Sequence, residues 1–124
     1  MSAAILQGAP ATTLDTDIWV NLPERQFVRL NALVQAEGGT MLAPTVAALS
    51  DDTLLNFLPR VDGLRSFAAE YKESLSVKWH GREVRVLPLQ KIIRSKEFVG
   101  RPKDIAHLPL LRQTLRIHQA ARSA

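Results

Sequence analysis

The alternation of apolar and polar positions predicts a strand followed by a helix in the first third of the chain. Within residues 15–22, the run Ile-Trp-Val at 18–20 favours extended structure. Apolar residues then recur three or four positions apart, at Phe27, Leu30, Leu33 and Val34. This spacing predicts a helix with one buried face, capped by Asn21 at its start and ended by Gly38-Gly39.

Further strand and helix signals follow, separated by Gly and Pro residues. The predicted elements are a strand at 54–58 stopped by Pro59, a short helix at 66–72, a hairpin formed by 75–79 and 84–86 around Gly81, a helix from Pro88 to Gly100, and a helical region that starts near Pro102 and restarts at Pro109. Residues 40–53 give no clear prediction. Because strands and helices are mixed and one strand pair is antiparallel, we predict the α+β (mixed α/β) class, not a doubly wound parallel sheet.

The composition is that of a soluble globular protein of one domain, which we expect to span residues 1–124. Hydrophobic residues make up 46% and charged residues 23% of the chain. There is no cysteine, which excludes disulfides, zinc–thiolate sites and cysteine nucleophiles. No apolar run approaches the roughly 18 residues of a membrane span, and the first four residues lack the basic start of a signal peptide. We therefore expect a cytoplasmic protein that does not enter a membrane.

The charges are distributed unevenly between the two halves of the chain. Residues 1–62 carry three basic and seven acidic side chains, whereas residues 63–124 carry thirteen basic and five acidic ones. An acidic half and a basic half suit a site where carboxylates hold a cation and basic groups hold phosphates. The same distribution is also expected of two ordinary solvated faces, so charge alone leaves both interpretations open.

The pair of carboxylates in Asp15-Thr16-Asp17 is the strongest candidate for chemistry. In a strand, residues two apart point to the same face, about 7 Å apart along the chain. Both carboxylates can then reach one cation, and oxygen ligands of this kind suit magnesium. The alternative is a pair of solvated carboxylates at the start of a strand, and spacing alone does not decide between the two.

Three segments of the chain resemble one protein family. Residues 8–18, Gly-Ala-Pro-Ala-Thr-Thr-Leu-Asp-Thr-Asp-Ile, resemble the Gly-x-x-Arg-x-Thr-x-Asp-h-Asp-h element (h, apolar) of the nucleotidyltransferase superfamily, which has the DNA polymerase β-like fold. Residues 89–104 resemble its minimal and abortive-infection-type branch from bacterial toxin–antitoxin systems, in which an apolar helix ending in Ser-Lys precedes Gly-Arg-Pro-Lys-Asp. Residues 60–64 before Phe67 resemble the same branch, so the resemblance covers about residues 5–115.

This resemblance implies a small nucleotidyltransferase-like domain with a short mixed sheet and flanking helices. It implies that Asp15 and Asp17 bind Mg²⁺ and are catalytic, and that nucleotide phosphates contact Thr13, Lys96, Arg101 and Lys103. The implied reaction is the transfer of a nucleoside monophosphate from a nucleoside triphosphate to a protein or RNA acceptor. The implied partners are a toxin–antitoxin partner protein and a second copy of the chain in a homodimer.

The sequence departs from the family pattern at three places. The family has a Gly-Gly or Gly-Ser turn shortly before the aspartate strand, which would lie upstream of Met1 in an N-terminally shortened chain. Ala11 stands where the loop arginine is expected. A third carboxylate is expected on a neighbouring strand within residues 54–58, and the position holds Asn56, which supplies neither a charge nor a base. These departures support an alternative: a catalytically degenerate fold that acts as a partner-binding or regulatory module.

Other residues give weaker signals. Asp104 has a structural interpretation, as the N-terminal cap of the last helical region. The histidines at 80, 107 and 118 have no metal-ligand spacing, and the two tryptophans are expected to pack in the core. A basic RNA-binding domain without nucleotide chemistry is a third hypothesis. The low aromatic content of 6% and the absence of an RNA-binding signature argue against it.

Overall fold

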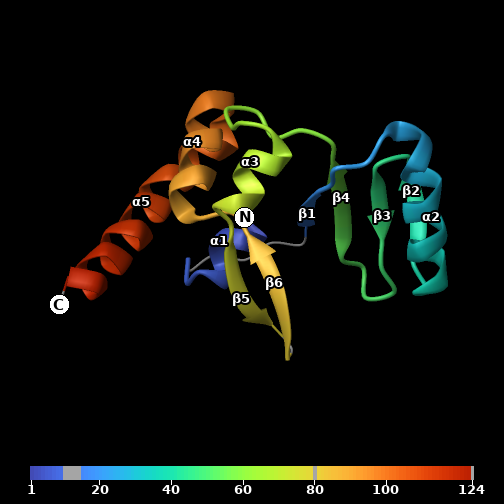
Figure 1. Cartoon of the computed structure of the whole chain (residues 1–124), viewed down its shortest axis with the longest axis horizontal. Helices are drawn as coiled ribbons and strands as arrows, with labels where there is room; N and C mark the ends of the chain where they lie inside the picture. The colour runs from blue at the N-terminus through green and yellow to red at the C-terminus, as the bar shows by residue number, and fades with distance from the viewer. Residues whose placement is uncertain (10–14, 80, 124) are drawn as a thin grey trace. The chain divides into compact units, whose positions relative to one another are not determined.

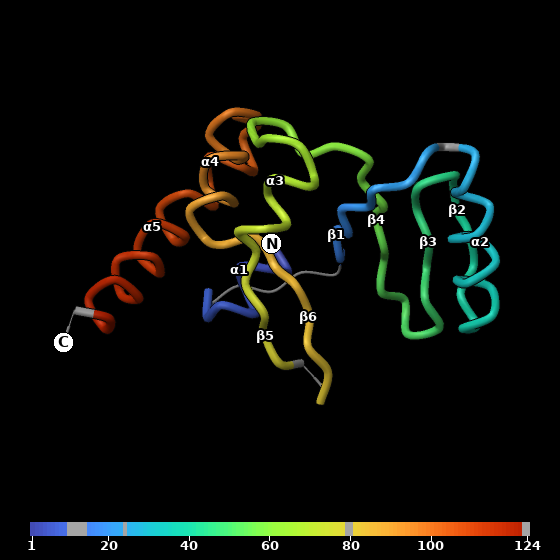
Figure 2. The backbone as a smooth tube through the Cα atoms, viewed as in Figure 1, coloured from blue at the N-terminus to red at the C-terminus, as the bar shows by residue number. Residues whose placement is uncertain are grey.

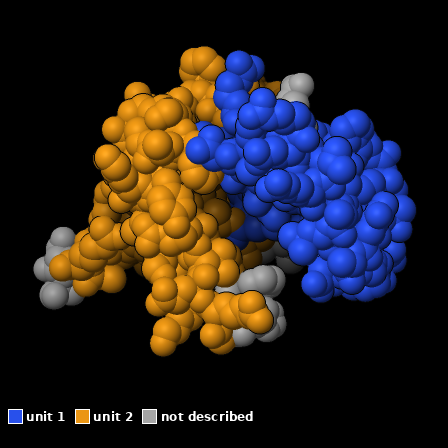
Figure 3. Space-filling model, turned by 45° about the vertical axis from the view of Figure 1, so that its right-hand side comes forward, with its two compact units in different colours: residues 1–2, 12–60 blue, residues 3–11, 61–124 orange. Residues whose placement is uncertain are grey.

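The computed structural model describes residues 1–9, 15–79 and 81–123, and it has the predicted α+β class. The chain divides into two compact units, coloured separately in Figure 3. Unit 1 comprises residues 1–2 and 12–60, and unit 2 comprises residues 3–11 and 61–124. Each unit has its own buried side chains and is described separately.

Unit 1 is a four-stranded mixed sheet with one helix (Figure 1). Its elements are β1 (Asp15–Trp19), a 3-10 helix (Glu24–Gln26), α2 (Phe27–Ala36), β2 (Thr40–Ala43), β3 (Val46–Ala48) and β4 (Leu54–Leu58). The strand order is β1-β4-β3-β2, in which β1 and β4 are parallel and the other pairs are antiparallel. Because a parallel pair needs a crossover, the α2 helix and the β2–β3 hairpin form the connection.

The core of unit 1 lies between α2 and one face of the sheet. Its buried centre is formed by Val34, Ala47 and Phe57. Partly buried apolar side chains surround it, namely Val20, Leu30, Met41 and Leu55. The helical positions 30 and 34 are one turn apart, as the apolar spacing of the sequence predicts.

Unit 2 combines helices with a two-stranded antiparallel ribbon. Its elements are α1 (Ser2–Leu6, of which residues 3–6 belong here), α3 (Phe67–Lys72), β5 (Leu75–Trp79), β6 (Arg82–Val86), α4 (Leu89–Val99) and α5 (Pro102–Ser123). Figure 2 shows that α4 and α5 form a helical hairpin, joined at Gly100. The buried apolar side chains are Ala4, Ala9, Val86, Leu89, Ile92, Ile93, Leu108 and Leu111.

Local signals in the sequence explain most of the element boundaries in unit 2. The short helix predicted at 66–72 is present as α3, and the Ser66 hydroxyl caps it by accepting a hydrogen bond from the Ala69 backbone amide. Pro88 precedes the first residue of α4, and Gly100 ends that helix in the left-handed conformation with a φ of 66°. The predicted hairpin around Gly81 is present as β5 and β6.

Two helix boundaries differ from the sequence prediction. The first long helix begins at Phe27 and not after Asn21, because the chain first forms a 3-10 turn in which the Gln26 amide donates to the Pro23 carbonyl. The last helix does not restart at Pro109 but runs through it. Leu108 and Leu111 are buried on one face across this point, and their burial offsets the roughly 3 kcal/mol that an interior proline costs.

The loop that leads into α3 is held on α4 within unit 2. Gly63 has a φ of 83°, and a Cβ atom there would lie 2.7 Å from the Cβ of Phe98. The Ser95 hydroxyl donates a hydrogen bond of 2.8 Å to the Asp62 carbonyl. Glycine is therefore required at 63 both by its conformation and by its close contact with α4.

Candidate functional site

The β1–β4 pair of unit 1 brings together two predicted site residues and Asn56. The register places Asp17 opposite Asn56, and the Asn56 amide nitrogen donates a hydrogen bond of 2.9 Å to Asp17 Oδ1. Asp15 and Asp17 are both exposed, and they share one face of β1 because side chains in a strand alternate. The neighbouring strand on which a third carboxylate was expected is therefore β4, and Asn56 supplies an amide there in place of a carboxylate.

The apolar pattern of β4 explains why Asn56 points to this face. Leu55 and Phe57 belong to the core of unit 1, so the residue between them projects to the opposite side of the sheet. The parallel register then sets Asn56 beside Asp17. One polar residue in an apolar strand is therefore enough to place an oxygen-bearing side chain next to the Asp pair.

The donor set on this face fits a magnesium ion in its chemistry. Two carboxylates and an amide carbonyl are hard oxygen ligands, and Mg²⁺ is typically held by one or two carboxylates together with waters and substrate phosphates. Rotating the Asn56 amide by half a turn would present its oxygen in place of its N–H. Among the described residues, no three His, Cys, Asp or Glu side chains are grouped as metal ligands. The group contains two carboxylates and relies on the amide and on substrate for further oxygen ligands.

The predicted phosphate-binding residues Lys96 and Arg101 lie together in unit 2, around a buried carboxylate. Asp104 has only 2% of its surface exposed. Arg101 Nε donates to its Oδ2 at 2.7 Å, and Lys96 Nζ lies 3.4 Å from its Oδ1. Lys96 Nζ is also 3.3 Å from His107 Nδ1. The hydrogen bond from Arg101 lowers the pKa of Asp104 and outweighs the opposing effect of burial, so this carboxylate stays ionised.

The structure thus groups some predicted site residues and separates others. Lys96 and Arg101 share Asp104, whereas Lys103 is exposed in the first turn of α5. Asp104 was predicted to cap the last helix, but it is the third residue of α5 and not the residue before it. Its carboxylate forms ion pairs with Lys96 and Arg101 instead. Asp15 and Asp17 belong to unit 1. Thr13 and Ala11 lie outside the described residues.

The contact between Lys96 and His107 predicts a pH dependence of stability. Burial and the Lys96 charge lower the pKa of His107. The folded state therefore binds this proton less readily than the unfolded state, and the resulting stabilisation is complete above the ordinary pKa of about 6.5 and is lost as the pH falls toward the lowered value. We expect the urea midpoint of the wild type to fall between pH 7 and pH 5.

His107→Asn is the control variant for this experiment. The asparagine amide oxygen can accept the hydrogen bond that His107 Nδ1 accepts from Lys96, but the amide does not titrate. The urea midpoint of this variant is expected to change less than that of the wild type over the same range. The ion pairs of Asp104 and Glu70 lower the pKa of both carboxyls, so both stay ionised in the folded protein throughout this window. Equal pH dependence in both proteins would contradict this role of His107.

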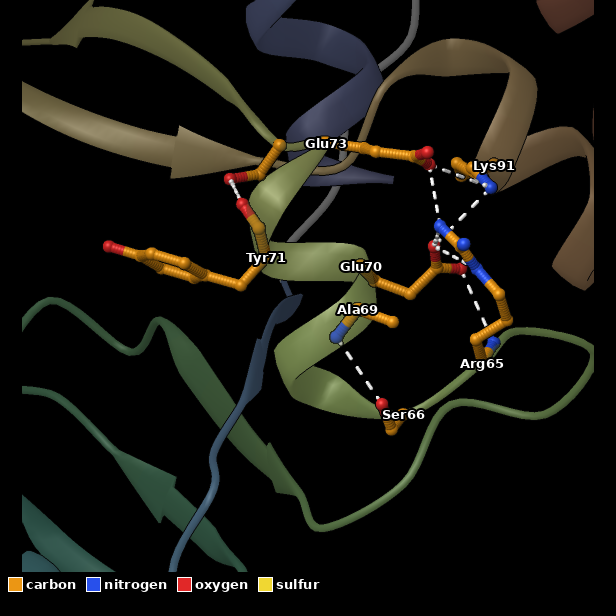
Figure 4. A network of polar contacts seen from close by, with 8 residues as sticks. Arg65, Ser66, Ala69, Glu70, Tyr71, Glu73 and Lys91 are labelled. Carbon is orange, nitrogen blue, oxygen red and sulfur yellow. Dashed lines mark hydrogen bonds and ion pairs between the residues drawn. The ribbon is translucent and has the colours of Figure 1, made fainter.

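A second charge network in unit 2 was not predicted from the sequence (Figure 4). Glu70 on α3 is buried, with a side chain that is 1% exposed. Arg65 Nη2 donates to its Oε1 at 2.8 Å, and Lys91 Nζ on α4 lies 3.3 Å away. The same two cations also pair with Glu73, at 2.7 and 3.2 Å. Burial alone would raise the pKa of Glu70, but the hydrogen bonds from Arg65 and Lys91 lower it below its usual value.

No protein-family model, curated protein or solved structure matches this chain. Among the described residues, no helix has the length and apolar character required to cross a membrane.

Proposed function

We propose that this protein is a nucleotidyltransferase-like enzyme that transfers a nucleoside monophosphate from a nucleoside triphosphate to a hydroxyl group of a protein or RNA. In this reaction the acceptor oxygen forms a bond to the α-phosphorus, the bond to the bridging oxygen breaks, and pyrophosphate leaves. The observation that carries the proposal is the grouping of Asp15, Asp17 and Asn56 on one face of the β1–β4 pair.

The chain's own residues have defined roles in this proposal. Asp15 and Asp17 hold a magnesium ion, and Asn56 fixes the Asp17 carboxylate by its amide hydrogen bond. When bound, the ion neutralises phosphate charge and polarises the reacting phosphoryl group. Both aspartates are on an edge strand and exposed, which leaves the face accessible to a triphosphate.

The phosphate contacts are proposed to come from Thr13, Lys96, Arg101 and Lys103. Unit 2, which contains the last three, has thirteen basic and six acidic side chains, whereas unit 1 has three basic and six acidic ones. The buried Asp104 carboxylate holds Lys96 and Arg101 in fixed positions, and it neutralises one of their two charges. Lys103 is exposed in the first turn of α5 and forms no ion pair within the described residues.

A second candidate function is a non-catalytic module with the same fold, for example one partner of a toxin–antitoxin pair or a homodimer. The observation that favours it is the Asn56 side chain. Asn56 stands where the resembled family has a third carboxylate, and its amide N–H donates a hydrogen bond to one carboxylate oxygen of Asp17. It predicts that removal of the Asp pair leaves partner binding and cellular phenotype unchanged.

The enzyme proposal predicts transfer of radioactivity from α-labelled triphosphates to protein or RNA in the presence of Mg²⁺. Asp15→Asn/Asp17→Asn is expected to lower the transfer rate by about 100-fold or more, because both metal-binding charges are removed. Asp51→Asn/Asp52→Asn is the matched control. It removes two carboxylates from the same unit, and Asn is compatible with the positive φ of 67° at position 52. Absence of transfer by the wild type, with an intact phenotype for the first variant, would favour the non-catalytic module.

A further inference from the structure

The strand that carries the Asp pair ends in an aromatic residue on the same face. Trp19 is the last residue of β1, two positions after Asp17, and its register partner on β4 is Leu58. The Val20 amide then donates a hydrogen bond of 2.9 Å to the Leu58 carbonyl, so the pairing with β4 continues past the indole. Because side chains in a strand alternate, Trp19 lies on the face of β1 that carries Asp15 and Asp17.

Trp19 is not one of the side chains that form the core of unit 1. That core lies on the other face of the sheet, where the neighbouring Val20 packs. Trp19 is partly exposed, and its Nε1 atom is buried. Any part of the ring that meets solvent is therefore carbon, which recognises a ligand by apolar contact and stacking and not by hydrogen bonds. The other aromatic side chains of unit 1, Phe27 and Phe57, are buried.

We propose that Trp19 stacks on the nucleobase of the nucleoside triphosphate, a proposal that rests on the nucleotidyl-transfer function. In that function the phosphates lie at the ion held by the Asp pair, and Trp19 is about 7 Å further along the strand than Asp17. Of the three parts of such a ligand, the base alone has a flat π-face, whereas the ribose and the phosphates are polar. An aromatic ring beside the phosphate-binding carboxylates therefore suits the base.

This contact also defines the substrate class. Stacking does not distinguish bases by hydrogen bonds, because every nucleobase presents a π-face. We therefore expect nucleoside triphosphates with different bases to bind with similar affinities. Loss of a stacked aromatic ring is expected to weaken binding roughly 5- to 150-fold, and the phosphates contribute nothing to this difference.

The test is isothermal titration calorimetry of the full chain with two ligands in the presence of Mg²⁺. The first is an ATP analogue with a methylene group in place of the oxygen between the α- and β-phosphorus, which prevents transfer. The second is inorganic tripolyphosphate, which has no base. Trp19→Leu should bind the analogue about tenfold or more weakly than the wild type, but tripolyphosphate within about twofold. Trp19→Phe keeps an aromatic ring and should bind the analogue within about threefold of the wild type.

Fluorescence reports the same contact directly. Trp79→Phe leaves Trp19 as the only tryptophan of the chain. In this variant the analogue should quench the emission of Trp19 by stacking, whereas tripolyphosphate should leave it unchanged. Quenching by both ligands alike, or by neither, would overturn the proposal.

The two ligands separate this inference from the function on which it rests. Asp15→Asn/Asp17→Asn should weaken both ligands, because the ion binds the phosphates of each. If Trp19→Leu loses both ligands equally, or loses neither, the stacking role is overturned and the Asp pair remains the phosphate site. If the wild type binds neither ligand, or binds them independently of the Asp pair, the nucleotidyl-transfer function is overturned together with this inference.

Discussion

Replacing Glu70 with glutamine is expected to destabilise the protein by about 3 kcal/mol, measured as the free energy of unfolding in urea. The Glu70 side chain is 1% exposed and accepts contacts from Arg65 and Lys91, so its charge is compensated only inside this network. The neutral glutamine side chain would leave Lys91, which is 19% exposed, without its buried counter-charge. The expected loss is at the low end for a broken buried ion pair, because Arg65 is half exposed and can turn to water.

Glu73→Gln is the matched control for this experiment. Glu73 contacts the same two cations, but its side chain is 52% exposed, so its removal should cost about 0.5 kcal/mol or less. The difference between the two variants then measures the effect of burial with the partners held constant. Equal destabilisation by both substitutions would mean that Glu70 does not depend on its buried environment, and it would contradict the role assigned to the network in Figure 4.

Replacing both Asp15 and Asp17 with asparagine is expected to weaken binding of a divalent cation by about 100-fold. A carboxylate about 4 Å from a divalent ion contributes roughly 2 kcal/mol even in water, and salt reduces this value at an exposed site. Two such groups on one strand face therefore dominate the affinity of the site. Mn²⁺ is the probe, because it accepts the same oxygen ligands as Mg²⁺ and its free concentration is measured directly by electron paramagnetic resonance.

Asn56→Asp is expected to act in the opposite direction. A carboxylate opposite Asp17 would supply a third negative charge to the same face of the sheet. Mn²⁺ should bind this variant about tenfold more tightly or better, whereas without metal the three carboxylates repel one another and lower stability slightly. No gain in affinity would indicate that the β1–β4 face does not act as one metal site.

The sequence predicted the parts of the fold that depend on local chemistry. Ser66, Pro88 and Gly100 mark helix ends through side-chain or backbone preferences that act within a few residues. The strand at 54–58 follows from its apolar run and the proline that ends it. Residues 40–53 were not assigned, because β2 and β3 are short, and β2, an edge strand, alternates weakly. Their pairing depends on β4 and α2, which local spacing does not encode.

The candidate site was predictable to a similar extent. Because side chains alternate along a strand, Asp15 and Asp17 lie on one face of β1. The two apolar neighbours of Asn56 are in the core, which places Asn56 on the opposite face of β4. The pairing of β1 with β4 is a long-range property, and local spacing contains no information on it. Asp104 was expected as a cap, because its position near a helix start is visible whereas its contacts to Lys96 and Arg101 are not.

Buried charge was the hardest feature to predict. Glu70 lies on the face of α3 that turns to the interior, three residues after Phe67, and this spacing is the signal that marks its burial. Its partners come from the preceding loop and from α4, twenty-one residues further along. A charged residue at a buried helical position requires such partners, and the sequence alone does not identify them.

The measurement that tests the proposed site most directly is a Mn²⁺ titration of four proteins, followed by electron paramagnetic resonance in the presence and absence of a nucleoside triphosphate. We predict one order of affinity: Asn56→Asp above wild type, wild type equal to Asp51→Asn/Asp52→Asn, and Asp15→Asn/Asp17→Asn about 100-fold weaker. Binding that is indifferent to residues 15, 17 and 56, or that is lost equally on changing residues 51 and 52, would show that the Asp pair is an ordinary solvated strand end.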